Sequence, residues 1–507
     1  MAAPAPRMGI AAATAAVVGF FAAAVLPRAT WPLFDSDVWW HIRAGREILA
    51  SGIVPRTDTW SIAGHGRHWT SQDWLSNVIL AGGHSLGLWG DTALSFLFGG
   101  LTVLAFWLLW RAIAIRVPGI GWMSRVAWLS VGLAVAGPVL GIRVQVLDLV
   151  LAVTVLWLLW HYLADRRRRW LVALPPVAAL WANLHAGWVL LFLLVGATIV
   201  GEAADRIVRR RAAGTPPLEW HQLRDVALAA LGSAAALIVN PNGIDLYNYP
   251  FRTLSISSLS RYVMEWSPAS LDTVFGWLLL ALVIVVAIPT VVFGRRNLRT
   301  ADVMIVAGLI VMSWEAIRFL LIAGPITSAI AAMAVSPTLS QTRVGRDIST
   351  LLLRLEQPRV GFARILNGAL LAAVLVIGIG IAFLRSSPAA EASQVARRLP
   401  EAAIQWMNAN NPGQRLFNFY EWGGYIGLER PNHLIFMDGR ADVYGEDLLD
   451  MYASVISLQS DPQVIMDRFH IDHVLLPVNQ PLGAWFDRSP FWRRAYADTV
   501  TVIWVRR

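Results

Sequence analysis

Long apolar runs separated by short polar segments dominate the first three quarters of this 507-residue chain. A helix needs roughly 17–25 apolar residues to cross a bilayer, and eleven runs are candidates, three of them short. They lie at about 9–27, 92–110, 126–142, 145–163, 171–184, 187–203, 226–239, 273–293, 302–317, 319–335 and 366–384. No convincing cleavage site follows the first run, so we interpret it as an anchor. The pattern predicts a polytopic α-helical membrane protein with about 11 transmembrane helices.

Arginine is distributed unequally between the loops on the two sides of these spans. Up to residue 384, one set of alternating loops holds 21 arginines and the other holds nine. The arginine-rich set is expected in the cytoplasm, which makes the N-terminus cytoplasmic. Three longer segments then lie outside: a first loop at 28–91, a middle loop at 240–272 and a C-terminal domain at 385–507. We expect the transmembrane domain, 1–384, to lie in the inner (plasma) membrane as a multi-pass protein.

The C-terminal segment has a different pattern, in which short strand-like runs alternate with helical ones. The strand-like runs are Arg415–Tyr420, His433–Asp438, His473–Val478 and Thr499–Val505, and the helical patterns lie at 391–410, 446–458 and 461–470. This alternation predicts a small extracytoplasmic α/β domain.

Composition supports the membrane assignment and excludes several classes. The chain is 56% hydrophobic and only 15% charged, whereas soluble domains are about a quarter charged. It has no cysteine, and all 42 basic residues are arginine, which excludes disulfides and the lysine of a phosphate-binding loop. The net charge of +9 divides into +12 for residues 1–385 and −3 for 386–507. Because the excess lies mainly in short loops, we expect membrane lipids rather than nucleic acid as partners.

Candidate carboxylates lie in the first and middle loops. Asp35 and Asp37 follow the first span, and such a pair can hold a hard divalent cation or supply a general base. The alternative is that they cap the helix that follows. Asp73 likewise opens a helical stretch, as a cap or a supporting residue. Glu265 could face a cleft or could be an ordinary interfacial glutamate.

Polar residues also lie near the outer ends of the spans. Arg143 and Arg318 could bind phosphate oxygens through their planar guanidinium groups. Asn183 and His185 occupy a tight turn, where His185 could bind metal, donate a hydrogen bond or serve only the turn. Asp148 could be a salt-bridge partner of Arg143.

Four motifs follow one another in an informative order. They are Asp37 before Trp39-Trp40-His41-Ile42-Arg43, Glu265 within Val263-Met264-Glu265-Trp266-Ser267-Pro268, Arg318 within Ile317-Arg318-Phe319, and Tyr420-Glu421-Trp422-Gly423-Gly424-Tyr425-Ile426 before Asp438-Gly439-Arg440. In order and sidedness they resemble the GT-C superfamily of membrane glycosyltransferases, and most closely the catalytic subunit of oligosaccharyltransferase.

The resemblance implies roles for individual residues. Asp37 and Glu265 would be catalytic and, with Asp35, would hold a divalent cation, Mn²⁺ or Mg²⁺. Arg318 would lie near the lipid phosphates. Substrate-binding residues would be Arg143, Arg318, His41, Asn183, His185, Tyr420, Glu421 and Trp422. The second outside loop has no Asp-x-Asp pair, although the family carries its second metal motif there.

The expected function is the transfer of a sugar or glycan from a polyprenyl-phosphate or pyrophosphate donor. The acceptor would be a lipid, a glycan or a protein on the outer face of the membrane, and the anomeric configuration would be inverted. Two alternatives remain open at this point: a flippase or transporter for lipid-linked glycans, and a metal-independent glycan polymerase or ligase.

Overall fold

The computed structural model describes residues 19, 21, 23–33, 35–212, 215–339, 341–343, 346–347 and 362–507. The chain divides into two compact units, each assembled from segments far apart in the sequence. The helical unit comprises 1–31, 95–239 and 268–385, and the mixed unit comprises 32–94, 240–267 and 386–507. Most of the first predicted span, at 9–27, lies outside the described residues.

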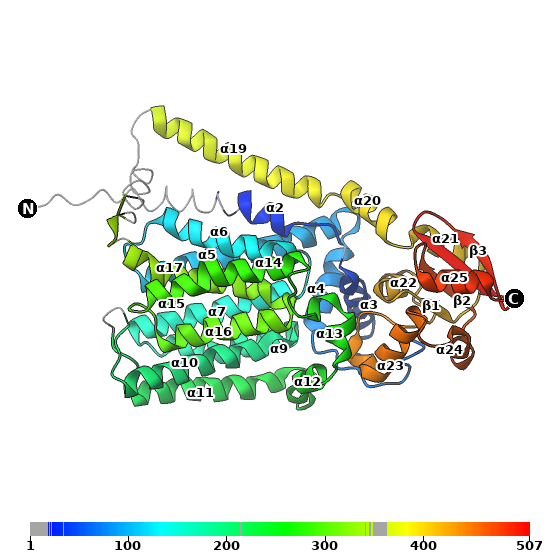
Figure 1. Ribbon diagram of the computed structural model, residues 1–507, viewed down its shortest axis with the longest axis horizontal. Helices are drawn as coiled ribbons and strands as arrows, with labels where there is room; N and C mark the ends of the chain where they lie inside the picture. The colour runs from blue at the N-terminus through cyan, green and yellow to red at the C-terminus, as the bar shows by residue number, and fades with distance from the viewer. Residues whose placement is uncertain are drawn as a thin grey trace, which may run out of the picture. The chain divides into compact units, whose positions relative to one another are not determined.

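The helical unit is a bundle in which long apolar helices run side by side (Figure 1). Its longer helices are α5 (Gly90–Arg116), α6 (Trp122–Ala136), α7 (Gln145–Asp165), α9 (Leu174–Leu184), α10 (Val189–Ile207), α11 (Trp220–Ala236), α16 (Thr300–Glu315), α17 (Leu320–Leu339) and α19 (Phe362–Arg385). One further helix is continuous through α14 (Val274–Ala281), the π-helical turn η6 (Leu282–Ala287) and α15 (Ile288–Gly294). Short elements are α2 (Leu26–Ala29), η2 (Gly137–Val139), α8 (Arg169–Val172), η3 (Ala186–Trp188), η4 (Leu237–Val239) and η7 (Ile317–Phe319).

Helices α7 and α17 form the interior of this bundle, since they are the most buried of its long apolar helices. Helix α17 packs closely on α6 through paired glycines. A Cβ at Gly132 would lie 2.8 Å from the Gly324 carbonyl oxygen, and a Cβ at Gly324 would lie 2.8 Å from the Gly132 carbonyl oxygen. Small residues that let helix backbones approach are the usual packing device between helices in lipid.

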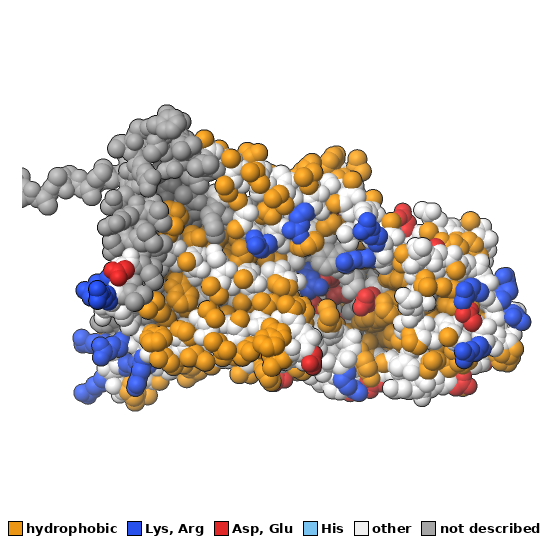
Figure 2. Space-filling view, turned by 45° about the horizontal axis from the view of Figure 1, so that its top comes forward, with side chains coloured by type: hydrophobic (Ala, Val, Ile, Leu, Met, Phe, Trp, Pro, Cys, Tyr) orange, Lys and Arg blue, Asp and Glu red, His pale blue; other side chains and the backbone are white. Residues whose placement is uncertain are grey.

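The surface of the helical unit is largely apolar (Figure 2). Trp277, Phe293 and Trp314 are each more than half exposed. Arginine side chains gather at one end of this unit, the left end in Figure 2, and the turn after α7 exposes Arg167 and Arg168. An apolar belt with arginine at one end is what a membrane-spanning bundle requires.

The number of eleven spans is not confirmed. Among the described residues, six helices are long and apolar enough to cross a membrane, or seven if one bent pair counts as a single span. Helices occur at each of the last ten predicted positions, but α6, α9 and α16 have only 15, 11 and 16 residues. The apolar runs at these places extend into short 3-10 turns and loops, so their composition overstates the length of the helix.

The mixed unit contains a four-stranded sheet in the order β1-β2-β4-β3. Strand β1 (Leu416–Asn418) pairs in parallel with β2 (His473–Pro477), and β4 (Thr501–Arg506) pairs antiparallel with both β2 and β3 (Trp492–Ala497). The predictions of strands near 415–420, 473–478 and 499–505 are therefore confirmed. Strand β3 was not predicted, because its polar residues Arg493 and Arg494 are exposed on the edge of the sheet.

Helices surround this sheet and fill the two loops. In the loops they are α3 (Ser36–Ser51), α4 (Trp74–His84), η1 (Gly87–Trp89), α12 (Asp245–Leu254), α13 (Ser258–Tyr262) and η5 (Met264–Trp266). In the C-terminal segment they are α20 (Pro388–Arg398), α21 (Glu401–Asn410), η8 (Tyr420–Trp422), α22 (Gly423–Glu429), α23 (Ala441–Ile456), α24 (Pro462–Arg468) and α25 (Pro481–Arg488). The helix expected over 391–410 is two helices, because Pro400 interrupts the pattern.

The expectation of a strand over 433–438 is wrong. Leu434 and Ile435 form only isolated bridges, to Arg415 and Ser61. These two residues make backbone hydrogen bonds to other segments. The next two residues bond to the Asn418 side chain, whose Oδ1 accepts from the Phe436 amide at 2.7 Å and whose Nδ2 donates to the Met437 carbonyl at 2.9 Å. The backbone hydrogen bonds of this segment are thus shared among several loops and one side chain, and no continuous strand pairing forms.

One hydrophobic core joins the three segments of the mixed unit. Trp60 and Trp69 come from the first loop, Leu259 from the middle loop, and Phe436 and Trp492 from the C-terminal segment. Both loops were predicted as part of the transmembrane domain, whereas in the structure they group with the C-terminal segment. Chain segments separated by hundreds of residues therefore fold as one body.

A buried arginine joins the first loop to the C-terminal segment inside the mixed unit. The Arg440 guanidinium lies 2.8 Å from both Asp58 and Asp438, and all three side chains are almost fully buried. It also lies over the Trp60 and Trp69 rings, 4.1 and 4.5 Å from their centroids. A charge can be buried only when its neighbours compensate for lost hydration, and here two carboxylates and two aromatic faces do so.

Replacing Arg440 should destabilise the mixed unit strongly. Arg440→Met leaves Asp58 and Asp438 buried without their partner, a change that typically costs about 3–5 kcal/mol and lowers the Tm by roughly 6–20 °C in a domain of this size. Arg494→Met is the matched control, because Arg494 pairs with Asp487 at the surface, where a pair contributes about 0–1 kcal/mol. Thermal unfolding followed by tryptophan fluorescence checks this, and equal shifts in both variants would contradict the account.

Candidate functional site

The first turn of α3 carries the paired carboxylates of the first loop. Asp35 is the N-cap, and its Oδ1 accepts the Asp37 amide at 3.0 Å. The capping interpretation is thus confirmed for Asp35. Asp37 lies two residues further on in the same first turn, half-buried, at the positive end of the helix dipole, which stabilises its charge. Of the two residues, Asp35 is the N-cap and Asp37 belongs to the helix itself.

Two glycines of the C-terminal segment bring its backbone onto this turn. A Cβ at Gly439 would collide with the Asp37 carboxylate and would lie 3.1 Å from Trp40 Nε1. A Cβ at Gly424 would lie 2.9 Å from the Ser36 carbonyl oxygen. Gly424 therefore lets α22 pack on the first turn of α3, and Gly439 lets the turn before α23 pack on the Asp37 side chain. This close approach explains why glycine occupies both places.

Further acidic and phenolic groups surround Asp37. Burial, with the Asp37 carboxylate as the next cause, raises the pKa of Tyr420 well above its usual value; Tyr444, Asp438 and Asp442 add to the effect. Tyr420 therefore keeps its proton and can donate it in a hydrogen bond. Burial and the nearby Asp73 charge raise the pKa of Asp442 to about 7, which is the range in which a carboxyl exchanges protons most readily at neutral pH.

His41 is part of the support beneath this turn. It is buried, its Nδ1 lies 2.5 Å from Asn77 Oδ1 and 3.4 Å from Asp73 Oδ2, and its ring stacks on Trp40 at 3.6 Å. These contacts join α3 to α4. The predicted substrate-binding role of His41 stays a prediction, and the contacts indicate that His41 positions α3.

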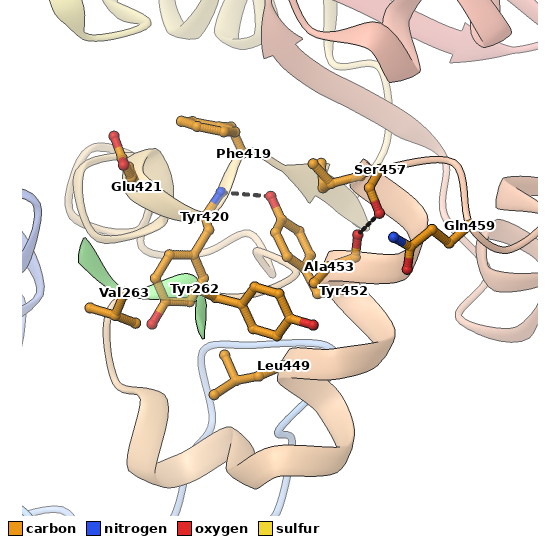
Figure 3. Close-up of a pocket in the computed structure, with 11 residues that line it drawn as sticks. Tyr262, Val263, Phe419, Tyr420, Glu421, Leu449, Tyr452, Ala453, Ser457 and Gln459 are labelled. Carbon is orange, nitrogen blue, oxygen red and sulfur yellow. Dashed lines mark hydrogen bonds between the residues drawn. The ribbon is translucent and has the colours of Figure 1, made fainter. Parts of the chain in front are cut away.

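The segment Tyr420–Trp422 forms the short helix η8 beside α3. The Tyr420 amide donates to the Tyr452 hydroxyl at 2.8 Å, and the Trp422 indole donates to the Arg398 carbonyl at 2.9 Å. Burial and the nearby Asp35 charge raise the pKa of Glu421. Figure 3 shows Tyr420 and Glu421 beside Tyr262 and Tyr452 at a pocket. Two of the three residues thus line a cavity, and Trp422 anchors their helix.

The cation site predicted from Asp35, Asp37 and Glu265 stays a prediction. Glu265 lies half-buried in η5, and Asp35 accepts the amide of its own helix. Within the described part of the chain, no group of three or more His, Asp or Glu side chains is arranged to hold a metal ion. Buried polar atoms that lack a protein partner at this turn are donors, Trp40 Nε1 and Arg440 Nη1. Donors suit oxygen atoms of a substrate rather than a cation, so we derive no step through a metal.

The remaining predicted residues belong to the helical unit. Arg143 lies half-buried just before α7, and Arg318 lies half-buried in η7. The Asn183 amide donates to the Ala179 carbonyl at 2.7 Å. Both Asp148 oxygens are bonded, one to His185 Nδ1 at 2.6 Å and one to the Trp181 indole at 2.8 Å. Asp148 thus fixes the turn before α10.

Sequence reasoning did not identify Asp442 or Tyr452. Asp442 lies two residues after the motif Asp438-Gly439-Arg440, so the motif indicated the right region of the chain but not this residue. Its pKa depends on Asp73, which lies far away in the sequence. Tyr452 is an ordinary apolar-face residue of α23 by pattern alone. Neither role is visible without the tertiary contacts.

Comparison with solved structures gives the fold. The chain is similar to ArnT from Cupriavidus metallidurans in the apo state, with 15% identity, 97% of this chain and 96% of that chain covered, and a TM-score of 0.51. It is similar to the oligosaccharyltransferase of Archaeoglobus fulgidus in complex with Zn and sulfate, with 13% identity, 96% and 73% coverage, and a TM-score of 0.54. ArnT bound to undecaprenyl phosphate gives 15% identity, 98% coverage of each chain, and a TM-score of 0.50.

The sequence matches no protein-family model, and the comparison with curated proteins gives no match. The likeness to the solved structures extends over almost the whole chain. The predicted resemblance is therefore confirmed as a distant likeness of fold to ArnT and to an oligosaccharyltransferase. The chain is a polytopic α-helical membrane protein with a small C-terminal sheet.

The raised pKa of Asp442 predicts a pH-dependent effect on stability. Asp73 and Asp438 raise this pKa and Arg440 lowers it, with burial as the largest cause. A carboxyl whose folded pKa is raised stabilises the fold while it is protonated, and this contribution is lost as the pH rises toward 7. Asp442→Asn should therefore raise the Tm at pH 8, by roughly 2–4 °C for each kcal/mol that the buried charge costs in free energy of unfolding. At pH 5 the increase should be much smaller.

The matched control for this measurement is Asp447→Asn. The Arg67 hydrogen bond lowers the pKa of Asp447, so removing its charge should leave the Tm equal to or below that of the wild type at pH 8. A Tm difference for Asp442→Asn that is the same at pH 5 and pH 8 would contradict the assignment.

Proposed function

We propose that this protein is a glycosyltransferase that transfers a sugar or glycan from a polyprenyl-linked donor to an acceptor outside the inner membrane. The observation that carries the proposal is the enclosed position of Asp37, between the first turn of α3 and the Gly439 turn, in a chain with a GT-C-like fold. The N-terminus would be cytoplasmic and the mixed unit extracytoplasmic, as the arginine distribution predicts.

Asp37 would act on the acceptor nucleophile. Its carboxylate accepts the proton of an acceptor hydroxyl or amide, and the acceptor atom attacks the anomeric carbon of the donor. The bond between this carbon and the phosphate oxygen breaks, and the lipid phosphate leaves with the electron pair. A single displacement of this kind inverts the anomeric configuration. The Tyr420 hydroxyl, which keeps its proton, would donate a hydrogen bond beside Asp37 and hold the charge in place.

The donor would be a polyprenyl phosphate or pyrophosphate. The solved complex of ArnT with undecaprenyl phosphate supports a lipid-linked donor, because this chain has the same fold over nearly its whole length. Arg143 and Arg318 are the proposed phosphate ligands, since guanidinium groups bind phosphate oxygens in pairs. Asn183 and His185 would support the same role from their turn.

A divalent cation held by Asp37, Asp35 and Glu265 stays a prediction of the sequence. The step described for Asp37 requires no cation. Glu265 would then contact the acceptor, as its place in the middle loop suggests. Transfer measured in the presence of a strong chelator separates the two forms of the mechanism.

Asp37 and Asp35 provide a matched pair of variants. Asp37→Asn should reduce transfer by about 10²–10⁴-fold, the usual effect of removing a general base. Asp35→Asn should retain transfer within a few-fold, because asparagine is also a good N-cap. The measurement uses purified full-length protein in detergent with radiolabelled polyprenyl-linked sugars and a membrane extract as acceptor.

Thermal unfolding of both variants controls for the fold. Full transfer by Asp37→Asn would contradict the assignment of this residue. Equal losses in both variants would show that the helix start, and not the Asp37 carboxylate, is what transfer requires.

A further inference from the structure

A cavity of about 350 Å³ lies within the mixed unit, between three of its segments. The end of α13 contributes Tyr262 and Val263, η8 and the residue before it contribute Phe419 to Glu421, and α23 contributes the wall from Leu449 to Gln459. Figure 3 shows the tyrosine rings grouped at this cavity, with Glu421 and Gln459 at opposite ends of the group in this view. The volume is within the range of small-molecule sites.

The walls are held in place before any ligand arrives. Arg261 pairs with Glu446 and Asp450, each at 3.2 Å, and this joins α13 to α23. The Tyr452 hydroxyl accepts the Tyr420 amide at 2.8 Å and donates to the Asn418 carbonyl at 3.2 Å. Tyr452 therefore presents its ring to the cavity. A site whose walls are fixed in advance loses little entropy when a ligand binds.

The lining combines aromatic faces with polar ends. Tyr420 and Tyr452 have ring centroids 6.1 Å apart at an angle of 49°, and Tyr262 is 47% exposed. Glu421 and Gln459 supply a carboxyl and an amide. Aromatic rings attract the weakly positive C–H groups of a sugar ring through their negative faces, and carboxyl and amide groups bond its hydroxyls. The lining includes no arginine or histidine, so an anionic ligand has no counter-charge there.

The element η8, which lines this cavity, packs against α3, the helix that carries Asp37. Tyr420 lines the cavity, and its hydroxyl is also within the electrostatic reach of Asp37. A molecule in the cavity would thus contact the short helix that packs on the helix of Asp37. We propose that the cavity binds an uncharged sugar residue of the acceptor, with Tyr262 and Tyr452 against its ring faces and Glu421 and Gln459 at its hydroxyls. This inference rests on the proposed function and names its acceptor as a glycan or glycoconjugate.

Binding of simple sugars tests the proposal without a transfer assay. Saturation-transfer NMR on the full-length protein in detergent would use a panel of uncharged methyl pyranosides, with a neutral peptide and inorganic phosphate as comparison probes. At least one pyranoside should receive saturation at its ring C–H protons. Tyr262→Ala should raise the Kd of this pyranoside by about tenfold, which corresponds to 1.4 kcal/mol of binding free energy. Phe491→Ala is the matched control, because Phe491 is 57% exposed in the same unit and lies outside this lining.

The results separate this inference from the proposed function. Sugar binding should persist in Asp37→Asn, which is expected to lose transfer. Unchanged sugar binding in Tyr262→Ala, no binding by any pyranoside, or preferential binding of the peptide or of phosphate would overturn the cavity assignment. Loss of sugar binding in Tyr262→Ala together with full transfer by Asp37→Asn would keep the cavity and overturn the proposed function.

Discussion

The site in the mixed unit depends on one buried arginine side chain. Arg440 lies between Asp58 of the first loop and Asp438 of the C-terminal segment, with the faces of Trp60 and Trp69 over it. None of these groups could remain buried and charged without the others. Their mutual compensation joins two parts of the chain that are almost 400 residues apart, and Gly439, the residue that closes over Asp37, lies directly between Asp438 and Arg440.

From this anchor, the other features of the site follow. Because the turn at 438–440 is fixed, Gly439 sits against the Asp37 carboxylate, and Gly424 lets α22 pack on the same turn of α3. Tyr420 lines the aromatic cavity, and its short helix packs on α3. The fold thus places a carboxylate, a protonated phenol and a cavity suited to a sugar in one continuous body, while the predicted phosphate ligands Arg143 and Arg318 belong to the helical unit.

Much of the framework could be predicted from local patterns. Apolar runs predicted the positions of the long helices, Asp35 predicted the start of α3, and alternating apolar positions predicted three of the four strands. The predictions failed where the structure depends on residues that are far apart in the sequence. The segment 433–438 has a strand-like pattern, yet its backbone hydrogen bonds are divided between the first loop, the residues before β1 and the Asn418 side chain. Asp442 is an ordinary surface-type residue by sequence, and its raised pKa arises from burial and from Asp73.

The central claim is that close packing at Gly439 holds Asp37 in its working position. The most direct test is the transfer rate of Gly439→Ala, measured with its Tm. The backbone at 439 can accommodate alanine, but the added methyl meets the movable end of the Asp37 side chain. We predict a fall in transfer of at least tenfold with a Tm close to that of the wild type. Wild-type transfer by a folded Gly439→Ala variant would contradict the account.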